Sequence, residues 1–106
     1  MRIQLLTFPG CPHAHEAREA LEQAILRNGL AVPIEDVDMT SRRTPAALRG
    51  WSSPTILVDG RDVGGEIAPT GGGCRLYPHE NGELRGAPEA HVLDAALGRA
   101  ILARVC

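Results

Sequence analysis

The sequence predicts an α/β fold in which a central mixed sheet of about four strands is flanked by helices. Short apolar segments rich in β-branched residues alternate with segments whose apolar residues recur every three or four positions. The chain has 106 residues, of which 43% are apolar and 3% aromatic. This length suits one compact domain with a core of Leu, Ile, Val and Ala. We therefore expect a single domain over residues 1–106, in the order βαβαββα.

The first half of the chain predicts two strands and two helices. Pro12 fits the first turn of a helix, where its missing N–H leaves no partner unsatisfied, and Gly29 fits the cap at the other end. Pro33 limits the second strand to an edge or places the proline at the strand's start. Thr44 fits the cap of the short helix. The predicted elements are a strand at 2–8, a helix at 12–28, a strand at 31–39 and a short helix at 44–49.

The second half predicts a buried strand, a glycine-rich insertion, a hairpin and a last helix. Asp59 and Gly60 stop the buried strand. Asn81 and Gly82 are typical of a type I′ turn. The predicted elements are a strand at 54–60, an insertion up to residue 73, a hairpin at 74–86 and a helix at 88–105.

Charge and hydropathy exclude several classes of partner. The net charge is −2 and no basic cluster occurs, which disfavours nucleic-acid binding. No apolar run approaches the ~20 residues of a membrane span, and no targeting segment is recognisable. We therefore expect a cytoplasmic protein without a membrane partner; the pattern does not indicate an oligomeric state. In a reducing compartment, three cysteines favour free, redox-active or metal-binding thiols over structural disulfides.

Cys11 is the first candidate for chemistry. It follows the first strand and a Pro-Gly turn and precedes the first long helix. A helix N-terminus favours a thiolate over a thiol, and a cationic His13 would add to this effect if its side chain faced the sulfur. Two alternatives stay open: His13 pointing away, and Cys11 as a small buried apolar residue.

The segments "FPGCPHAHEA" at 8–17 and "WSSPTILVDG" at 51–60 resemble those of the thioredoxin-like superfamily over most of the chain. With "CRLY" at 74–77, the chain is similar to small bacterial thioredoxin- or glutaredoxin-like proteins loosely associated with organomercurial lyases. The resemblance implies that Cys11 is the nucleophile and that Pro54 is a cis-proline beside it. It also implies that the backbone of Ser53 offers its N–H and C=O to an extended substrate. Ala14 stands where the second cysteine of a C-x-x-C motif would be, which excludes a dithiol cycle within the motif.

Cys74 is the candidate partner of Cys11, because three glycines precede it and would give it a mobile tether. A disulfide requires Cα atoms within about 7 Å. If residues 74–77 were the fourth strand of the sheet, Cys74 would start at the far end from Cys11, so an idle thiol is the alternative. Trp51 could form an apolar wall over the site or pack the short helix against the core. Cys106 is expected to have no role.

The leading interpretation is a thiol-disulfide oxidoreductase that uses Cys11, Cys74, Pro54, Ser53, Trp51 and His13. Its partner would be a thiol or disulfide, including one in another protein, with no bound cofactor and with glutathione as a conceivable co-substrate. One alternative is a protein that binds mercury or another soft metal or handles organomercurials, because thiolates prefer such ions. Its carbon–metal cleavage would need a proton donor such as Asp59 or Asp62. A non-catalytic interaction domain is the other alternative.

Overall fold

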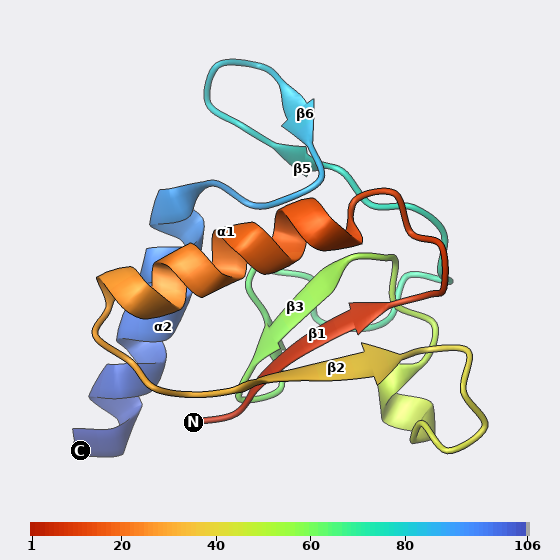
Figure 1. The fold of residues 1–106 in the computed structure, drawn as a ribbon, viewed down its shortest axis with the longest axis horizontal. Coiled ribbons are helices and arrows are strands. Elements are labelled where there is room, and N and C mark those ends of the chain that lie inside the picture. The colour runs from red at the N-terminus through yellow and green to blue at the C-terminus, as the bar shows by residue number, and fades with distance from the viewer. Residues whose placement is uncertain (106) are drawn as a thin grey trace.

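The fold combines a four-stranded mixed sheet, two long helices and a separate two-stranded hairpin (Figure 1). The computed structural model of the protein describes residues 1–105, so Cys106 and its expected lack of a role lie outside the described residues. The strands are β1 (Ile3–Thr7), β2 (Ile34–Asp38), β3 (Thr55–Val58), β4 (Arg61–Asp62), β5 (Tyr77–Pro78) and β6 (Leu84–Arg85). The helices are α1 (Ala14–Arg27), the 3₁₀ helix η1 (Ala46–Leu48) and α2 (Ala90–Val105).

The central sheet has the strand order β2-β1-β3-β4. β2 runs parallel to β1, whereas β3 runs antiparallel to β1 and places Thr55 opposite Leu6. β4 is antiparallel to β3 and joined to it by the two-residue turn of Asp59 and Gly60, whose φ angles of 50° and 80° suit a tight hairpin. Because β1 and β3 are antiparallel, the end of β1 that leads to Cys11 lies beside the start of β3.

The two faces of the sheet bury different parts of the chain, because successive side chains of a strand point to opposite faces. Both α1 and α2 pack on one face, against side chains of β1 and β3. The other face is covered by Trp51 and by the half-buried Leu48 of η1. The strand residues in the first core are Ile3, Leu5, Ile56 and Val58, and those in the second core are Leu6 and Leu57.

Helix boundaries differ from those that the sequence predicts. α1 begins at Ala14, two positions after Pro12, although Gly29 follows it with the expected left-handed φ of 65°. The predicted helix at 44–49 is only the 3₁₀ turn η1, and Thr44 does not cap it. Instead the Thr44 hydroxyl donates a hydrogen bond of 2.6 Å to the carbonyl oxygen of Asp38. Thr44 therefore stabilises the loop after β2, and this second helical element is shorter than expected.

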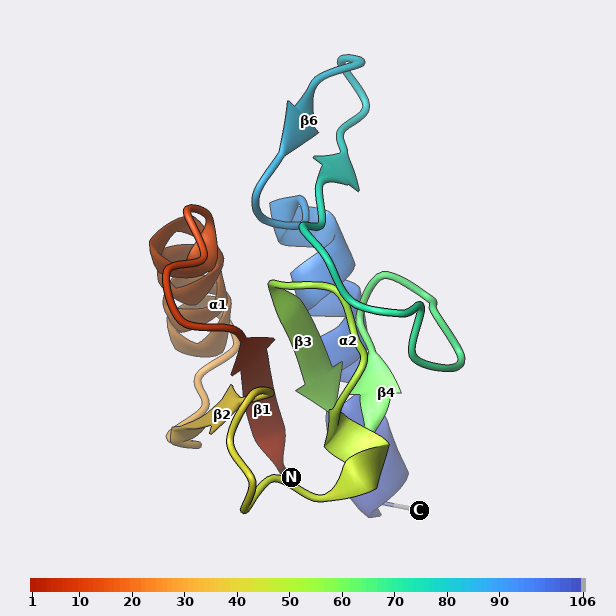
Figure 2. The same cartoon turned by 90° about the vertical axis from the view of Figure 1, so that its right-hand side faces the viewer.

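The sequence-based prediction for the last strands of the sheet is wrong in two respects. The fourth strand is β4, directly after the Asp-Gly turn, and the hairpin of β5 and β6 forms its own two-stranded sheet. The hairpin turn contains His79, whose carbonyl accepts the Gly82 N–H at 2.9 Å. Only Gly82 of the Asn81-Gly82 pair has a positive φ, 88°, so the turn is not type I′. The hairpin stands away from the sheet in both views (Figures 1 and 2).

Neither of the two long helices described here has the length and apolar character needed to cross a membrane. The absence of a membrane partner and the cytoplasmic location both stay predictions.

We predict that Leu21→Ala lowers the free energy of unfolding by about 3 kcal/mol, because it leaves a cavity in the core between α1 and the sheet. Leu21 is fully buried, whereas Leu26 on the same helix is 69% exposed. Leu26→Ala is the matched control and should change the stability by less than ~0.5 kcal/mol. Urea unfolding of both variants measures the difference, and equal losses would contradict the assignment of the core face.

Candidate functional site

Cys11 lies in the turn between β1 and α1, and its side chain is partly exposed. The turn is closed by a hydrogen bond of 3.2 Å from the Cys11 N–H to the carbonyl oxygen of Phe8. The Ala14 N–H, at the start of α1, donates to the carbonyl oxygen of Cys11 at 3.4 Å. The cysteine therefore precedes the first turn of the helix.

Ser53 connects the end of β1 to the start of β3. Its hydroxyl oxygen accepts a hydrogen bond of 3.3 Å from the N–H of Phe8, three positions before Cys11. The Ser53 side chain is completely buried at this junction. The peptide bond between Ser53 and Pro54 is cis, the isomer that the resemblance implies.

Ser53 also contacts the segment that carries Cys74, through its backbone. The Ser53 N–H donates to the carbonyl oxygen of Gly73 at 2.8 Å, and the N–H of Arg75 donates to the carbonyl oxygen of Ser53, also at 2.8 Å. These bonds make Ser53 and Cys74 the partners of an isolated parallel β-bridge. Ser53 therefore contacts both the segment that leads to Cys11 and the segment that carries Cys74.

The glycine-rich insertion brings Cys74 to this end of the sheet. Gly71, Gly72 and Gly73 have φ angles of 98°, 91° and 87°, which other residues rarely adopt. The chain after β4 therefore returns to the start of β3, so the alternative that Cys74 begins at the far end of the sheet is wrong. Cys11 and Cys74 are both free thiols, and Cys74 is exposed.

The backbone of Ser53 is not open to a substrate in this structure. Its N–H and C=O are bonded to Gly73 and Arg75 of the same chain. The expectation that these groups are offered to an extended substrate is therefore wrong, because the insertion occupies the strand edge that such a substrate would use. The substrate-binding roles of Ser53 and Pro54 stay predictions.

Trp51 packs against the core. Its side chain is 7% exposed and contacts the cluster of Leu6 and Leu57. The indole N–H donates to the carbonyl oxygen of Ala47 in η1 at 3.2 Å. Of the two alternatives for Trp51, this geometry matches the one in which it fixes the short helix to the sheet, and contact with a substrate stays a prediction.

His13 is the residue before α1 and lies against the chain that leaves β6. A Cβ atom placed on Gly86 would be 2.5 Å from the His13 Cβ and 2.7 Å from its Nδ1, so this close approach requires glycine at position 86. The His13 Nδ1 is 4.0 Å from the Glu16 Oε1. These contacts fix the side chain between α1 and the hairpin, and its influence on the Cys11 thiolate stays a prediction.

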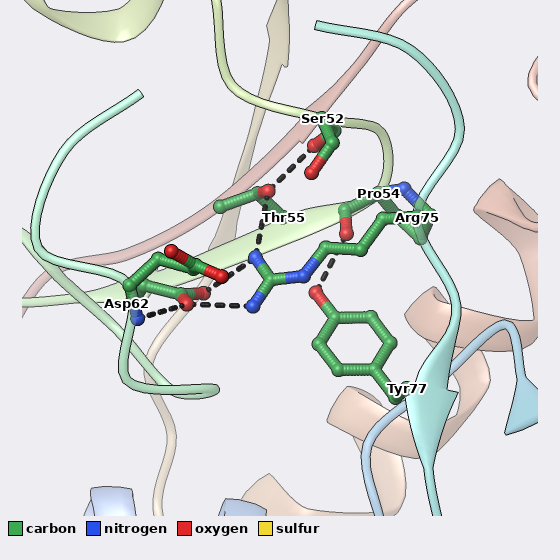
Figure 3. Close-up of polar contacts among 7 residues, drawn as sticks. Ser52, Pro54, Thr55, Asp62, Arg75 and Tyr77 are labelled. Carbon is green, nitrogen blue, oxygen red and sulfur yellow. Dashed lines mark hydrogen bonds and ion pairs between the residues drawn. The ribbon is translucent and has the colours of Figure 1, made fainter. Parts of the chain in front are cut away.

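A group of polar residues whose association the sequence did not predict anchors the segment after Cys74 (Figure 3). We call Arg75, Asp62, Thr55 and Tyr77 the Arg75 cluster. The Arg75 guanidinium donates to both carboxylate oxygens of Asp62, at 3.0 and 2.7 Å, and to the Thr55 hydroxyl at 3.1 Å. The Asp62 side chain is completely buried, and that of Arg75 is 11% exposed. Such a bidentate, desolvated pair constrains both position and orientation.

Tyr77 completes the Arg75 cluster. The Arg75 Cζ lies 4.4 Å from the centre of the Tyr77 ring, a distance suited to a cation–π interaction. The Tyr77 hydroxyl donates to the carbonyl oxygen of Pro54 at 2.6 Å. Burial lowers the pKa of Arg75, but hydrogen bonding to Asp62 and nearby negative charge outweigh it, so the pKa is raised. Burial raises the pKa of Tyr77 well above its usual value, and the Arg75 cation opposes this only in part.

Asp62 therefore forms a buried ion pair with Arg75. The sequence did not predict this structural role. No local pattern in the sequence indicates that Arg75 is buried or identifies its partner, because arginine is mostly exposed in proteins. Within residues 1–105, no three His, Cys, Asp or Glu side chains are close enough to form a metal site. The two free thiols, Cys11 and Cys74, are therefore the candidate reactive groups at this end of the sheet.

We predict that Arg75→Met lowers the free energy of unfolding by about 3 kcal/mol, because it leaves the Asp62 carboxylate buried without its partner. Arg61, the neighbour of Asp62 on β4, is exposed and supplies the matched control. Arg61→Met should change the stability by less than ~0.5 kcal/mol. Urea unfolding measures both variants, and similar values for the two would show that the ion pair does not stabilise the fold.

Tyr77 makes the cluster visible by spectroscopy, because it is the one tyrosine in the chain. We expect its phenol to stay protonated above pH 10, the usual value, while the protein is folded. Because the pKa of Tyr77 is higher in the folded than in the unfolded protein, its contribution to stability is fully present at pH values below the unfolded-state pKa. This contribution decreases as the pH rises above that pKa. Phenolate absorbance should therefore rise together with unfolding measured by circular dichroism. Ionisation near pH 10 in the folded protein would contradict the buried position.

The chain has no significant match among protein-family models, curated proteins or solved structures. The site is accordingly defined by its own geometry. It consists of a partly exposed Cys11, an exposed Cys74, Ser53 in contact with both segments, and the Arg75 cluster that anchors the second segment.

Proposed function

We propose that the protein is a thiol-disulfide oxidoreductase in which Cys11 is the nucleophile and Cys74 is the resolving thiol. The observation that carries the proposal is the double contact of Ser53. Its hydroxyl bonds to Phe8 in the segment that leads to Cys11, and its backbone bridges Cys74. Two free cysteines, a partly exposed Cys11 and an exposed Cys74, thereby lie at the same end of the sheet.

The reaction would proceed by two exchange steps. The Cys11 thiolate attacks one sulfur of a substrate disulfide, forms a mixed disulfide and releases the other sulfur as a thiolate, which takes a proton from water. The Cys74 thiolate then attacks the Cys11 sulfur, forms a Cys11–Cys74 disulfide and releases the second substrate thiolate. Two electrons thus pass from the protein dithiol to the substrate. Two equivalents of a small thiol such as glutathione would return them, without a bound cofactor.

The thioredoxin-like fold is part of this proposal. The strand order β2-β1-β3-β4, with β2 parallel and β3 antiparallel to β1, supports it. So do the position of Cys11 between β1 and α1 and the packing of both long helices on one face of the sheet. The reduction of the second helix to η1 and the separate hairpin are departures from the expected order.

Soft-metal binding is the second candidate function. The same pair of free thiols favours it, because two thiolates are enough for a linear mercury or copper(I) site. Tight binding of one ion per chain, lost in both Cys11→Ser and Cys74→Ser, would support this function over disulfide exchange. Asp62 would not supply the proton for carbon–metal cleavage, because its carboxylate is buried and bonded to Arg75.

We predict that mild oxidation removes Cys11 and Cys74 together from alkylation in the monomer. Mass-tagged alkylation followed by peptide mapping measures the accessible thiols before and after oxidation. In Cys11→Ser the Cys74 thiol should stay labelled, and in Cys74→Ser the Cys11 thiol should accumulate as a mixed disulfide with the substrate. Cys106→Ser is the control and should leave the paired loss unchanged.

Reduction of a disulfide substrate should fall to the uncatalysed rate in Cys11→Ser. If oxidation leaves Cys11 and Cys74 independently labelled, the resolving role of Cys74 is wrong and exchange by Cys11 alone is the remaining enzymatic mechanism. A Cys11 that reacts no faster with disulfides than a free thiol in solution would instead indicate the non-catalytic interaction domain.

A further inference from the structure

The backbone around Pro54 has its polar groups satisfied by the chain itself. Extended peptides bind proteins mainly by main-chain hydrogen bonds to an open strand edge, so such groups decide whether a peptide can dock. Three successive carbonyl oxygens accept internal hydrogen bonds here, and the Ser53 N–H is donated internally. The acceptors are Ser52, bonded to the Thr55 hydroxyl at 2.5 Å, Ser53, bonded to the Arg75 N–H at 2.8 Å, and Pro54, bonded to the Tyr77 hydroxyl at 2.6 Å.

The segment that occupies this edge is firmly held. Displacing residues 73–75 would break both backbone bonds to Ser53 and expose the buried ion pair of Arg75 and Asp62. Gly64 approaches Arg75 so closely that an added Cβ would clash with the guanidinium. Because a buried charge that loses its partner is strongly destabilising, an incoming peptide competes poorly with this segment.

A pocket remains beside Cys74. It lies between the glycine-rich insertion, the start of the hairpin and the start of α2. Its lining is mixed: it includes the charged residues Glu66, Arg75 and Glu89 as well as apolar residues, of which Leu76 is 46% exposed. Residues that line it include Ser52, Val63, Cys74, Leu76, Pro88 and Val92. A small molecule can enter this space without forming strand-like hydrogen bonds.

We infer that the substrate is a small disulfide and that extended polypeptide disulfides are excluded from the Cys11 end of the sheet. This inference rests on the proposed function and names its substrate class. An extended segment needs free main-chain groups to bind, whereas those of Ser52, Ser53 and Pro54 already form hydrogen bonds within the chain. The pocket beside Cys74, which Cys11 does not line, offers space for a small group next to the resolving thiol.

The test compares two mixed disulfides that release the same coloured thiol, thionitrobenzoate. One carries 2-mercaptoethanol, and the other carries a cysteine in the middle of an uncharged, extended peptide. Each rate constant with the reduced full-length protein is divided by the rate constant of the same compound with free glutathione. The Cys11→Ser protein supplies the background. We expect the normalised rate to be about tenfold or more higher for the small compound, because residues 73–75 occupy the strand edge along which an extended peptide would have to lie to reach Cys11.

Releasing the segment should change this preference. Arg75→Met removes the side chain that anchors residues 73–75, so the peptide rate should rise relative to the small-compound rate. Arg61→Met is the matched control on β4 and should keep the wild-type ratio. If Arg75→Met does not fold, the ratio measured for the wild-type protein alone decides the question.

Each outcome has a separate meaning. A peptide compound that reacts as fast as the small compound, or faster, would overturn the inference while leaving the oxidoreductase intact. If neither compound reacts with Cys11 faster than with free glutathione, the proposed function itself is wrong and the inference fails with it. A preference for the small compound that Arg75→Met reduces would support both.

Discussion

The buried ion pair between Arg75 and Asp62 is the interaction on which the rest of the site depends. Removing two charges from water costs several kcal/mol per ion, so such a pair is tolerated only when its hydrogen-bonding groups are satisfied. Here the carboxylate receives two bonds from the guanidinium and one from the Glu66 N–H, and Arg75 also bonds Thr55. The pair therefore ties a two-residue edge strand to the segment that carries Cys74.

The position of Cys74 follows from this anchor more than from the glycines before it. Gly71, Gly72 and Gly73 allow the chain to reverse, but a glycine has no side chain with which to choose one conformation. The side chain of Arg75 supplies that choice, one residue after the cysteine. Its backbone N–H simultaneously bonds Ser53, so the ion pair and the β-bridge restrain the same short segment.

Local patterns in the sequence predicted the features that depend on neighbouring residues. The apolar periodicity of α1, the β-branched run of β3 and the Asp59-Gly60 turn all have local causes, and the structure contains each of them. β4 was missed because two residues are too short for an alternating pattern. The Arg75 cluster was missed because its partners are 13 and 20 residues away from Arg75, and their contact exists only after the insertion has folded back.

An open strand edge invites pairing with other chains, and proteins commonly cover such edges. At the start of β3, this chain covers the edge with its own insertion, through the two backbone bonds of Ser53. The same two bonds hold an exposed cysteine where a partner strand would otherwise lie. Protection of the edge, placement of Cys74 and closure of the site to extended chains are therefore three consequences of one arrangement. Loosening the Arg75 anchor should therefore affect the edge, the position of Cys74 and the access of extended chains together.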